Sequence, residues 1–181
     1  MCGIVGYIGT QLATEILLSG LEKLEYRGYD SAGVATVCDG QIQSVRAKGK
    51  LYNLREKLVG VEMSANIGIG HTRWATHGKP EEYNAHPHRD DTERVAVVQN
   101  GIVENYRELR KELEAQGHKF VSDTDTEVIP HLIAEFLSKG ETGRRENFLQ
   151  AVRQTVNKLD GAFAIAVICA DYPNEIIVAR Q

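Results

Sequence analysis

Short stretches in which apolar residues alternate with small or polar ones occur in pairs along this chain, and stretches with apolar residues every three or four positions lie between them. A period of two predicts strands, and the longer spacing predicts amphipathic helices. The predicted strands are 4–8, 31–37, 41–46, 67–74, 94–99, 162–169 and 175–179, and the predicted helices are 11–24, 51–58, 105–116, 127–137 and 147–159. Because the strands come at hairpin distances, we expect antiparallel sheets covered by helices, an α+β fold, rather than repeated βαβ units.

Turn and capping residues support several of these boundaries. Asp39-Gly40 between two predicted strands is a favoured hairpin dipeptide. Asn105, with Glu108 three residues later, fits the start of helix 105–116, and Gly117 fits its end.

The segment 122–127, SDTDTE, precedes another predicted helix. Thr124 and Glu127 fit a capping box, which would place Asp125 in the first helical turn, where the helix dipole favours a carboxylate. Pro130 disfavours a regular helix at this point because it lacks an N–H and crowds the preceding turn. Either the entry turn is distorted, or the regular helix begins closer to Pro130.

Length and composition indicate one globular domain, 1–181. The 181 residues are 42% hydrophobic and 25% charged, with a net charge of -4 and no Lys/Arg-rich block, which argues against nucleic acid or an anionic membrane as partner. No apolar run approaches the roughly 20 residues of a membrane span, and the N-terminus does not resemble a secretory signal. Three widely spaced cysteines predict a reducing cytoplasm rather than a disulfide framework. The end at Gln181, directly after a strand, suggests a piece of a longer chain, and a natural C-terminus is the alternative.

The first residues, MCGIVGYIG, place a cysteine directly after the initiator methionine. A side chain as small as that of Cys2 permits removal of Met1, after which Cys2 carries both a thiol and a free α-amine. The alternative is a terminal cysteine that is buried as a small hydrophobe in the first strand. This stretch alone favours the second interpretation.

The densest polar cluster is HTRWATHG, residues 71–78, which follows the predicted strand IGIG. Binding residues are often found where a strand runs into a loop. The planar donor fork of Arg73 suits a carboxylate ligand, although an isolated arginine is more simply explained by a surface ion pair.

The histidines of this region raise the alternative of a zinc site. His71, His77, His86 and His88 could act as ligands together with Cys2. Apart from the HPH triplet at 86–88, no pair has the close spacing of zinc ligands, so the sequence favours no metal.

The segment VAVVQNG, residues 95–101, ends in Asn-Gly. After an apolar strand this dipeptide is a favoured hairpin turn, but residues 102–104 are few for a return strand before the next helix. The alternative is functional: the Asn100 side-chain amide and the Gly101 backbone N–H form a donor pair. Such a pair can bind the oxyanion of an acyl-transfer intermediate, and each donor lowers the activation barrier by about 2.7–4 kcal/mol.

Taken singly, each of these stretches has a structural explanation at least as good as the functional one. Together they supply a terminal thiol and amine at Cys2, a carboxylate-binding Arg73, paired donors at Asn100 and Gly101, and in segment 122–127 an acid able to hold an ammonium. A substrate with an α-carboxylate, an α-amino group and a side-chain carboxamide matches the whole set. That substrate is glutamine.

The motifs MCGIVGYIG, LEYRGYDSAG, HTRWATHG, NAHPH, VVQNG followed by VEN, and SDTDTEVI occur in this order. On these motifs, essentially the whole chain resembles the glutaminase domains of the glutamine–fructose-6-phosphate aminotransferases. These are class II glutamine amidotransferases of the N-terminal nucleophile hydrolase type. Other class II amidotransferases share the terminal cysteine but differ in the later motifs.

The resemblance implies a role for each matching position. Cys2 would be the nucleophile and its own α-amine the base, acting directly or through a water, because an amine of pKa about 7.7–8.0 is partly unprotonated near neutral pH. Asn100 and Gly101 would form the oxyanion hole. Arg73 would bind the glutamine α-carboxylate, and Asp125 would bind its ammonium.

Further residues are implied around the pocket. Thr76, His77 and Gly78 would line it from a loop that closes over the substrate. Arg27, in the YRGYD motif, would support the surroundings of the nucleophile, and Trp74 would gate the passage of ammonia to a partner domain.

The implied fold is a four-layer αββα sandwich of two antiparallel sheets with helices outside. The implied reaction is hydrolysis of L-glutamine to L-glutamate and ammonia through a thioester, without a metal or organic cofactor. In the family the ammonia converts fructose 6-phosphate to glucosamine 6-phosphate on sugar-isomerase-type domains, which nothing in this sequence resembles. The resemblance also implies a cytoplasmic homo-oligomer for the full-length enzyme.

Two alternatives remain open from the sequence. The chain could be the glutaminase domain of another class II amidotransferase that delivers ammonia elsewhere. It could also be a glutamine-binding module without turnover, if Met1 is retained and Cys2 has no free amine.

Overall fold

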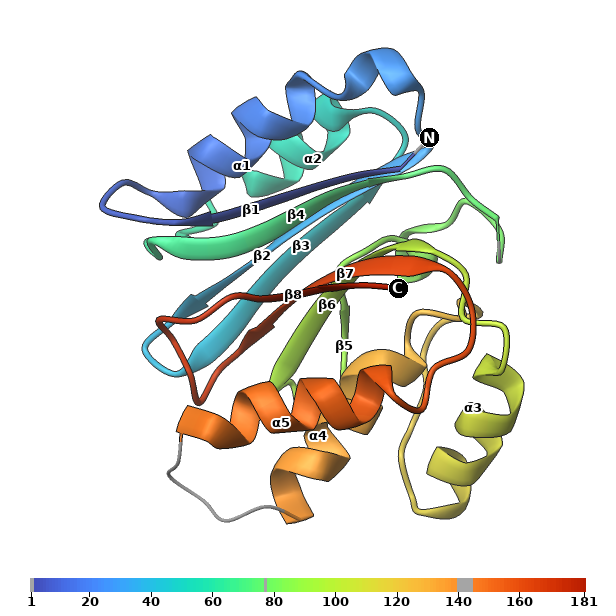
Figure 1. Ribbon diagram of the computed structural model, residues 1–181. Helices are drawn as coiled ribbons and strands as arrows, with labels where there is room; N and C mark the ends of the chain where they lie inside the picture. Colours follow the sequence, from blue (N-terminus) through green and yellow to red (C-terminus); the bar gives the residue numbers. More distant parts are fainter. Residues whose placement is uncertain (1, 77, 140–144) are drawn as a thin grey trace.

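The structure is a computed structural model that describes residues 2–76, 78–139 and 145–181. Within these residues, two four-stranded antiparallel sheets lie face to face (Figure 1). The order of the first sheet is β1 (Gly3–Ile8), β4 (Ile67–Arg73), β2 (Ser31–Cys38) and β3 (Gln41–Lys48). The order of the second is β5 (His88–Arg89), β6 (Val95–Gly101), β7 (Phe163–Cys169) and β8 (Ile177–Arg180).

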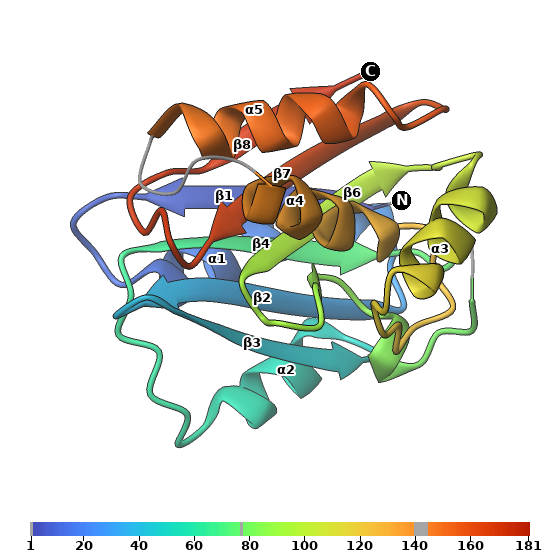
Figure 2. The same cartoon turned by 90° about the horizontal axis from the view of Figure 1, so that it is seen from below.

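Helices cover the outer face of each sheet (Figures 1 and 2). The helices α1 (Ala13–Glu22) and α2 (Leu51–Leu58) lie on the first sheet, and α3 (Tyr106–Ala115), α4 (Val128–Lys139) and α5 (Arg145–Val156) lie on the side of the second sheet. Two short 3₁₀ turns are η1 (Glu25–Arg27) and η2 (Glu82–Asn84). The expected α+β fold, a four-layer αββα sandwich, is confirmed. Among the described helices, none has the length and apolar character needed to cross a membrane.

The sequence pattern found every long element, with boundaries that shift by at most a few residues, and α2 has the predicted bounds. The hairpin at Asp39-Gly40 is confirmed: both residues have positive φ, 51° and 71°, as a tight two-residue turn requires. The two-residue strand β5 was not predicted, because so short a segment shows no periodicity.

The end of α3 is confirmed, but the predicted cap at its start is wrong. Gly117 has φ 101°, and the N–H of His118 donates to the Leu113 carbonyl, which closes the helix in a Schellman motif. Asn105 occupies the N-cap position without a capping hydrogen bond. Its Nδ2 donates to the Lys158 carbonyl (2.8 Å), and its Oδ1 accepts the N–H of Asp160 (3.0 Å). This tertiary contact ties the start of α3 to the segment before β7 and takes the place of the cap.

The helix that follows the SDTDTE segment begins at Val128, so Pro130 lies in its first turn, where no N–H is needed. Of the two possibilities at Pro130, the later start of the helix is correct. The expectation that Asp125 lies in the first helical turn is wrong, because Asp125 precedes the helix. The Thr124–Glu127 capping box is wrong as well: the Glu127 carboxylate accepts the N–H groups of Val121 and Ser122 instead.

The layer between the two sheets is apolar at its centre. Ile67 and Ile69 of β4 pack there with Ala96 and Val98 of β6 and with Ile168 of β7. Because side chains alternate along a strand, the next residues that face this layer are His71 and Arg73 on β4 and Asn100 on β6. The layer therefore changes from apolar to polar toward one end of the sandwich.

Candidate active site

Cys2 lies directly before β1, at the polar end of the layer between the sheets. The pairing of Gly3 with Thr72 places it beside the end of β4. The backbone N–H of Trp74 donates to the Cys2 Sγ at 3.2 Å. The Cys2 side chain is partly exposed, so the interpretation of a cysteine buried as a small hydrophobe is wrong.

Two side chains hold the backbone of this cysteine. Arg27 Nη1 and Asn100 Nδ2 each donate to the Cys2 carbonyl at 3.4 Å. Arg27 comes from η1 on the first sheet's side, and Asn100 comes from β6 of the second sheet. The nucleophile candidate is thus attached to both halves of the sandwich.

A cavity of about 670 Å³ opens at this point. Its lining residues are Cys2, Arg27, Trp74, Thr76, Asn100 and Gly101. All six are among the predicted site residues, although they come from distant parts of the sequence. The Trp74 side chain is 53% exposed at its rim.

Asn100 and Gly101 do not form a hairpin turn. Both belong to β6, where Asn100 pairs with Ala164 and Gly101 pairs with Phe163. Gly101 has φ 120°, and a Cβ at this position would lie 2.1 Å from the Ala162 carbonyl oxygen. Only glycine fits at this position. Because Gly101 has no side chain, its backbone itself forms part of the cavity wall.

The Asn100 amide has a fixed orientation because of His71, whose Nε2 lies 2.8 Å from Asn100 Oδ1. Burial lowers the pKa of His71 to about 4, so the ring is neutral at pH 7. Since an amide oxygen only accepts, the His71 Nε2 carries the proton and donates it. The Asn100 NH₂ group is thereby turned toward Cys2 and the cavity. From the sequence alone, His71 is considered only as a possible zinc ligand. Its position two residues after Ile69 places it on the same face of the strand, and this spacing could have predicted its contact with Asn100.

Arg73 and Asp125 are both 4% exposed and lie outside the residues that line the cavity. Burial lowers the pKa of the Arg73 guanidinium, and the neighbouring charges of Asp30, Cys2 and Asp125 oppose that shift. The Asp125 Oδ2 accepts the N–H of Val103 at 2.7 Å. Arg73 thus interacts electrostatically with both Cys2 and Asp125, which fits the predicted glutamine site.

The loop after β4 is held in place by residues that the sequence did not single out. The Asp30 carboxylate accepts the N–H of Ala75 at 2.7 Å. Asn84 donates to the Lys79 carbonyl (3.0 Å) and accepts the N–H of Asp123 (2.8 Å), so it links this loop to the segment that carries Asp125. The motifs YRGYD and NAHPH, which contain Asp30 and Asn84, were the available signal.

Gly78 has φ 77°, and a Cβ there would lie 2.6 Å from Asn84 Nδ2. The close packing of this loop on Asn84 therefore needs glycine. His77, the remaining predicted pocket residue, lies outside the described residues.

The other histidines of the zinc alternative form internal hydrogen bonds. His86 stacks on His71 with ring centroids 4.4 Å apart and accepts the N–H of Gln99 at its Nδ1. Its Nε2 lies 3.2 Å from Thr126 Oγ1, and the Nε2 of His88 lies 3.0 Å from Thr124 Oγ1. Both rings therefore connect the second sheet to segment 122–127.

The fold and this site define the class of protein. A protein-family profile described as a glutamine amidotransferase domain matches residues 71–181. The chain belongs to that family. The glutamine phosphoribosylpyrophosphate amidotransferase of B. subtilis superposes with a TM-score of 0.78 at 26% identity, covering 100% of this chain and 37% of that one. A second structure, described as the allosteric regulatory enzyme of purine biosynthesis, has a TM-score of 0.79 at 24% identity and shares the fold; the alignment covers 100% of this chain and 37% of that chain.

Within this class, similar relatives have one name: glutamine–fructose-6-phosphate aminotransferase (isomerizing). The protein of Nostoc sp. (strain PCC 9229) is 71% identical, that of Thermosynechococcus vestitus is 70% identical, and that of Aquifex aeolicus is 55% identical. Each alignment covers 100% of this chain but 29% of the relative. These findings confirm the resemblance that the motifs indicated.

The buried histidines predict a loss of stability in mild acid. Burial lowers the pKa of His71 to about 4 and that of His88 to about 3, and burial beside His71 and His88 lowers that of His86. The unfolded chain, with histidine pKa about 6.5, therefore binds more protons than the folded one between these values. The free energy of unfolding should fall by about 1 kcal/mol for each of the three between pH 7 and pH 5.5, as measured by urea unfolding. In a His88→Gln variant the fall in the free energy of unfolding over this pH range should be smaller by one third. An unchanged free energy of unfolding between pH 7 and pH 5.5 would contradict the lowered pKa values of these histidines.

His71 is predicted to act on catalysis through Asn100. In His71→Leu the amide loses its donor and can rotate away from the cavity. We expect kcat for glutamine hydrolysis to fall about 10- to 100-fold, the worth of a buried hydrogen bond of about 1–3 kcal/mol, with KM changed less than about threefold. His71→Asn, which can still donate, should recover part of kcat. Equal loss in both variants together with a lower melting temperature would indicate a purely structural role.

Proposed function

We propose that this domain hydrolyses L-glutamine to L-glutamate and ammonia, with Cys2 as the nucleophile. The observation that carries the proposal is the meeting of Cys2, Asn100 and Gly101 in one cavity, although about a hundred residues separate the thiol from the donors. Membership of the glutamine amidotransferase domain family identifies the substrate class.

The reaction follows from the chemistry of these groups. After removal of Met1, the α-amine of Cys2 takes the thiol proton, and the thiolate attacks the side-chain amide carbon of glutamine. The developing oxyanion binds the Asn100 amide and the Gly101 N–H. When the intermediate collapses, the C–N bond breaks and the α-ammonium returns its proton to the leaving ammonia. A γ-glutamyl thioester remains, and water releases glutamate.

Binding of the amino-acid end of glutamine is assigned to Arg73 and Asp125, which lie outside the cavity lining. Arg73 would hold the α-carboxylate through its donor fork, and Asp125 would hold the ammonium. Thr76, His77 and Gly78 would close the loop over the substrate, while Trp74 at the exposed rim would gate the exit of ammonia. Because Arg73 and Asp125 are buried in the described conformation, this assignment requires the loop to open when glutamine enters.

We propose further that the ammonia serves the synthesis of glucosamine 6-phosphate from fructose 6-phosphate. The identity of 71% to a glutamine–fructose-6-phosphate aminotransferase favours this over the phosphoribosyl alternative, for which the identity is 26%. The chain spans 29% of the length of the relatives it matches, so sugar binding and amino transfer would belong to sugar-isomerase-type domains elsewhere in a longer protein. As the resemblance implies, that protein would be a homo-oligomer. Free thiols at Cys2, Cys38 and Cys169 suit a cytoplasmic location.

Replacement of the nucleophile should abolish turnover. For Cys2→Ala we expect the release of ammonia from glutamine to fall below detection, a loss of more than about 10³-fold, while the melting temperature stays close to that of the unchanged chain. Full activity in the variant would falsify the mechanism.

A matched control tests the amine. A chain with an uncleavable extension before Cys2 keeps the thiol but has no free α-amine there. It should retain glutamine binding, measured by calorimetry, and lose turnover. A chain of confirmed N-terminal Cys2 that binds glutamine without hydrolysing it would support the binding-module alternative instead.

Asp125→Asn should mainly weaken substrate binding. The asparagine keeps an oxygen for the N–H of Val103 but removes the negative charge. Since a hydrogen bond to a charged group contributes about 1.5–3 kcal/mol, KM should rise about 10- to 100-fold with little change in kcat. Steady-state kinetics measure both parameters, and an unchanged KM would remove Asp125 from this role.

A further inference from the structure

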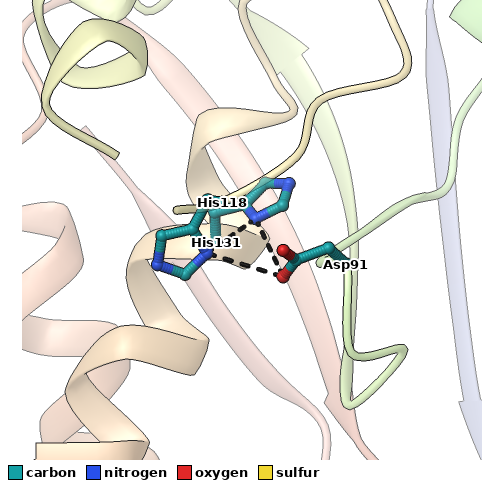
Figure 3. Close-up of side chains that lie close together, drawn as sticks. All are labelled: Asp91, His118 and His131. Atoms are coloured by element: carbon teal, nitrogen blue, oxygen red, sulfur yellow. Dashed lines mark hydrogen bonds and ion pairs between the residues drawn. The ribbon is translucent and has the colours of Figure 1, made fainter. Parts of the chain in front are cut away.

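Three side chains on the outer side of the second sheet converge outside the cavity: Asp91 after β5, His118 after α3, and His131 on α4 (Figure 3). The two Nδ1 atoms of the histidines are 3.2 Å apart. Asp91 Oδ1 lies 3.5 Å from the His118 Nδ1 and 3.6 Å from the His131 Nδ1. In the part of the chain that the structure describes, this is the one group of three or more His, Cys, Asp or Glu side chains whose candidate ligand atoms all lie within 4.8 Å of one another.

These separations match those of metal ligands. Zinc binds histidine nitrogen at about 2.0–2.1 Å and carboxylate oxygen at about 2.0–2.2 Å, so tetrahedral ligands are about 3.4 Å apart. The three atoms form a nearly equilateral triangle of this size. A cation in contact with all three would keep a fourth position for water on the side where the Asp91 carboxylate is 25% exposed.

The surrounding groups orient the three ligands. The backbone N–H of Lys119 donates to Asp91 Oδ2 at 3.1 Å, which leaves Oδ1 directed at the histidines. The outer nitrogens face carboxylates: His118 Nε2 is 3.4 Å from Glu135 Oε2, and His131 Nε2 is 3.9 Å from Glu127 Oε1. The contact with Glu135 fixes the His118 ring so that its opposite nitrogen can bind a metal, which is the usual arrangement around zinc. Glu127 lies near the outer nitrogen of His131 without a hydrogen bond to it.

We propose that Asp91, His118 and His131 form a binding site for a divalent transition metal of the zinc class. The site would bridge the turn after β5, the loop after α3, and α4. Its metal would brace the loop that leads to Asp125 and would take no part in glutamine chemistry. The proposal therefore stands independently of the proposed function.

The competing explanation is a hydrogen bond between the two imidazoles with Asp91 as a further acceptor. It accounts for the short distance between the Nδ1 atoms but predicts no metal affinity. The two explanations separate in a binding measurement at pH 7.5.

The experiment titrates Zn²⁺ into chelator-treated chain and follows binding by calorimetry and the midpoint of thermal unfolding. We expect one Zn²⁺ per chain and a rise of the midpoint with Zn²⁺ concentration, since a ligand that binds the folded state stabilises it. Co²⁺ in place of Zn²⁺ should give the visible absorption of tetrahedral nitrogen and oxygen ligation without thiolate charge-transfer bands.

The test variants are Asp91→Asn and His118→Gln, and Asp39→Asn in an exposed turn is the matched control. The first two should lower Zn²⁺ affinity at least about tenfold and abolish the rise in the midpoint, with glutamine hydrolysis retained in metal-free buffer. The control should bind as the unchanged chain does. Equal affinity in all variants, as expected for Zn²⁺ on Cys2, or no rise of the midpoint in the unchanged chain, would overturn the proposal.

Discussion

The alternation of side chains on two facing strands is the constraint on which the site depends. On β4 and β6 the side chains directed between the sheets are apolar at the centre. Every second residue along a strand faces the same side, so His71, Arg73 and Asn100 face this layer at one end. A shift of one residue in either register would turn these polar groups outward and bring Gln99 into the layer. The apolar packing of the sandwich therefore fixes the position of its polar end.

The Cys2 carbonyl joins the two sheets at that end. It accepts from Arg27 on one side and from Asn100 on the other, and the Asn100 amide is oriented by His71. Burial keeps the His71 ring neutral, because a charged imidazole would lose its hydration without a counter-ion. The Asn100 amide that faces the cavity is thus oriented by His71, which does not line the cavity.

Segment 122–127 connects the proposed substrate site with the rest of the second half. Asn84 and the buried histidines at 86 and 88 hold this segment from one side, and α4 continues from its end. In the cluster of Asp91, His118 and His131 (Figure 3), His131 Nε2 lies 3.9 Å from the Glu127 carboxylate at the end of this segment. Asp125 therefore belongs to a segment that several buried side chains hold in place.

The sequence by itself determined the order and type of the long elements, and it indicated the candidate chemistry. The periodicity of apolar residues indicated the strands, the helices and their antiparallel pairing, and the motifs around Cys2, Arg73, Asn100 and Asp125 indicated a glutamine site. Only the tertiary structure decided that Asn100-Gly101 continues a strand, that Asn105 bonds to the segment before β7 instead of capping its helix, and that His71 orients Asn100. The physical reason is that local patterns report only on neighbours along the chain. In each of these three cases the hydrogen-bond partner lies 29 or more residues away in the sequence.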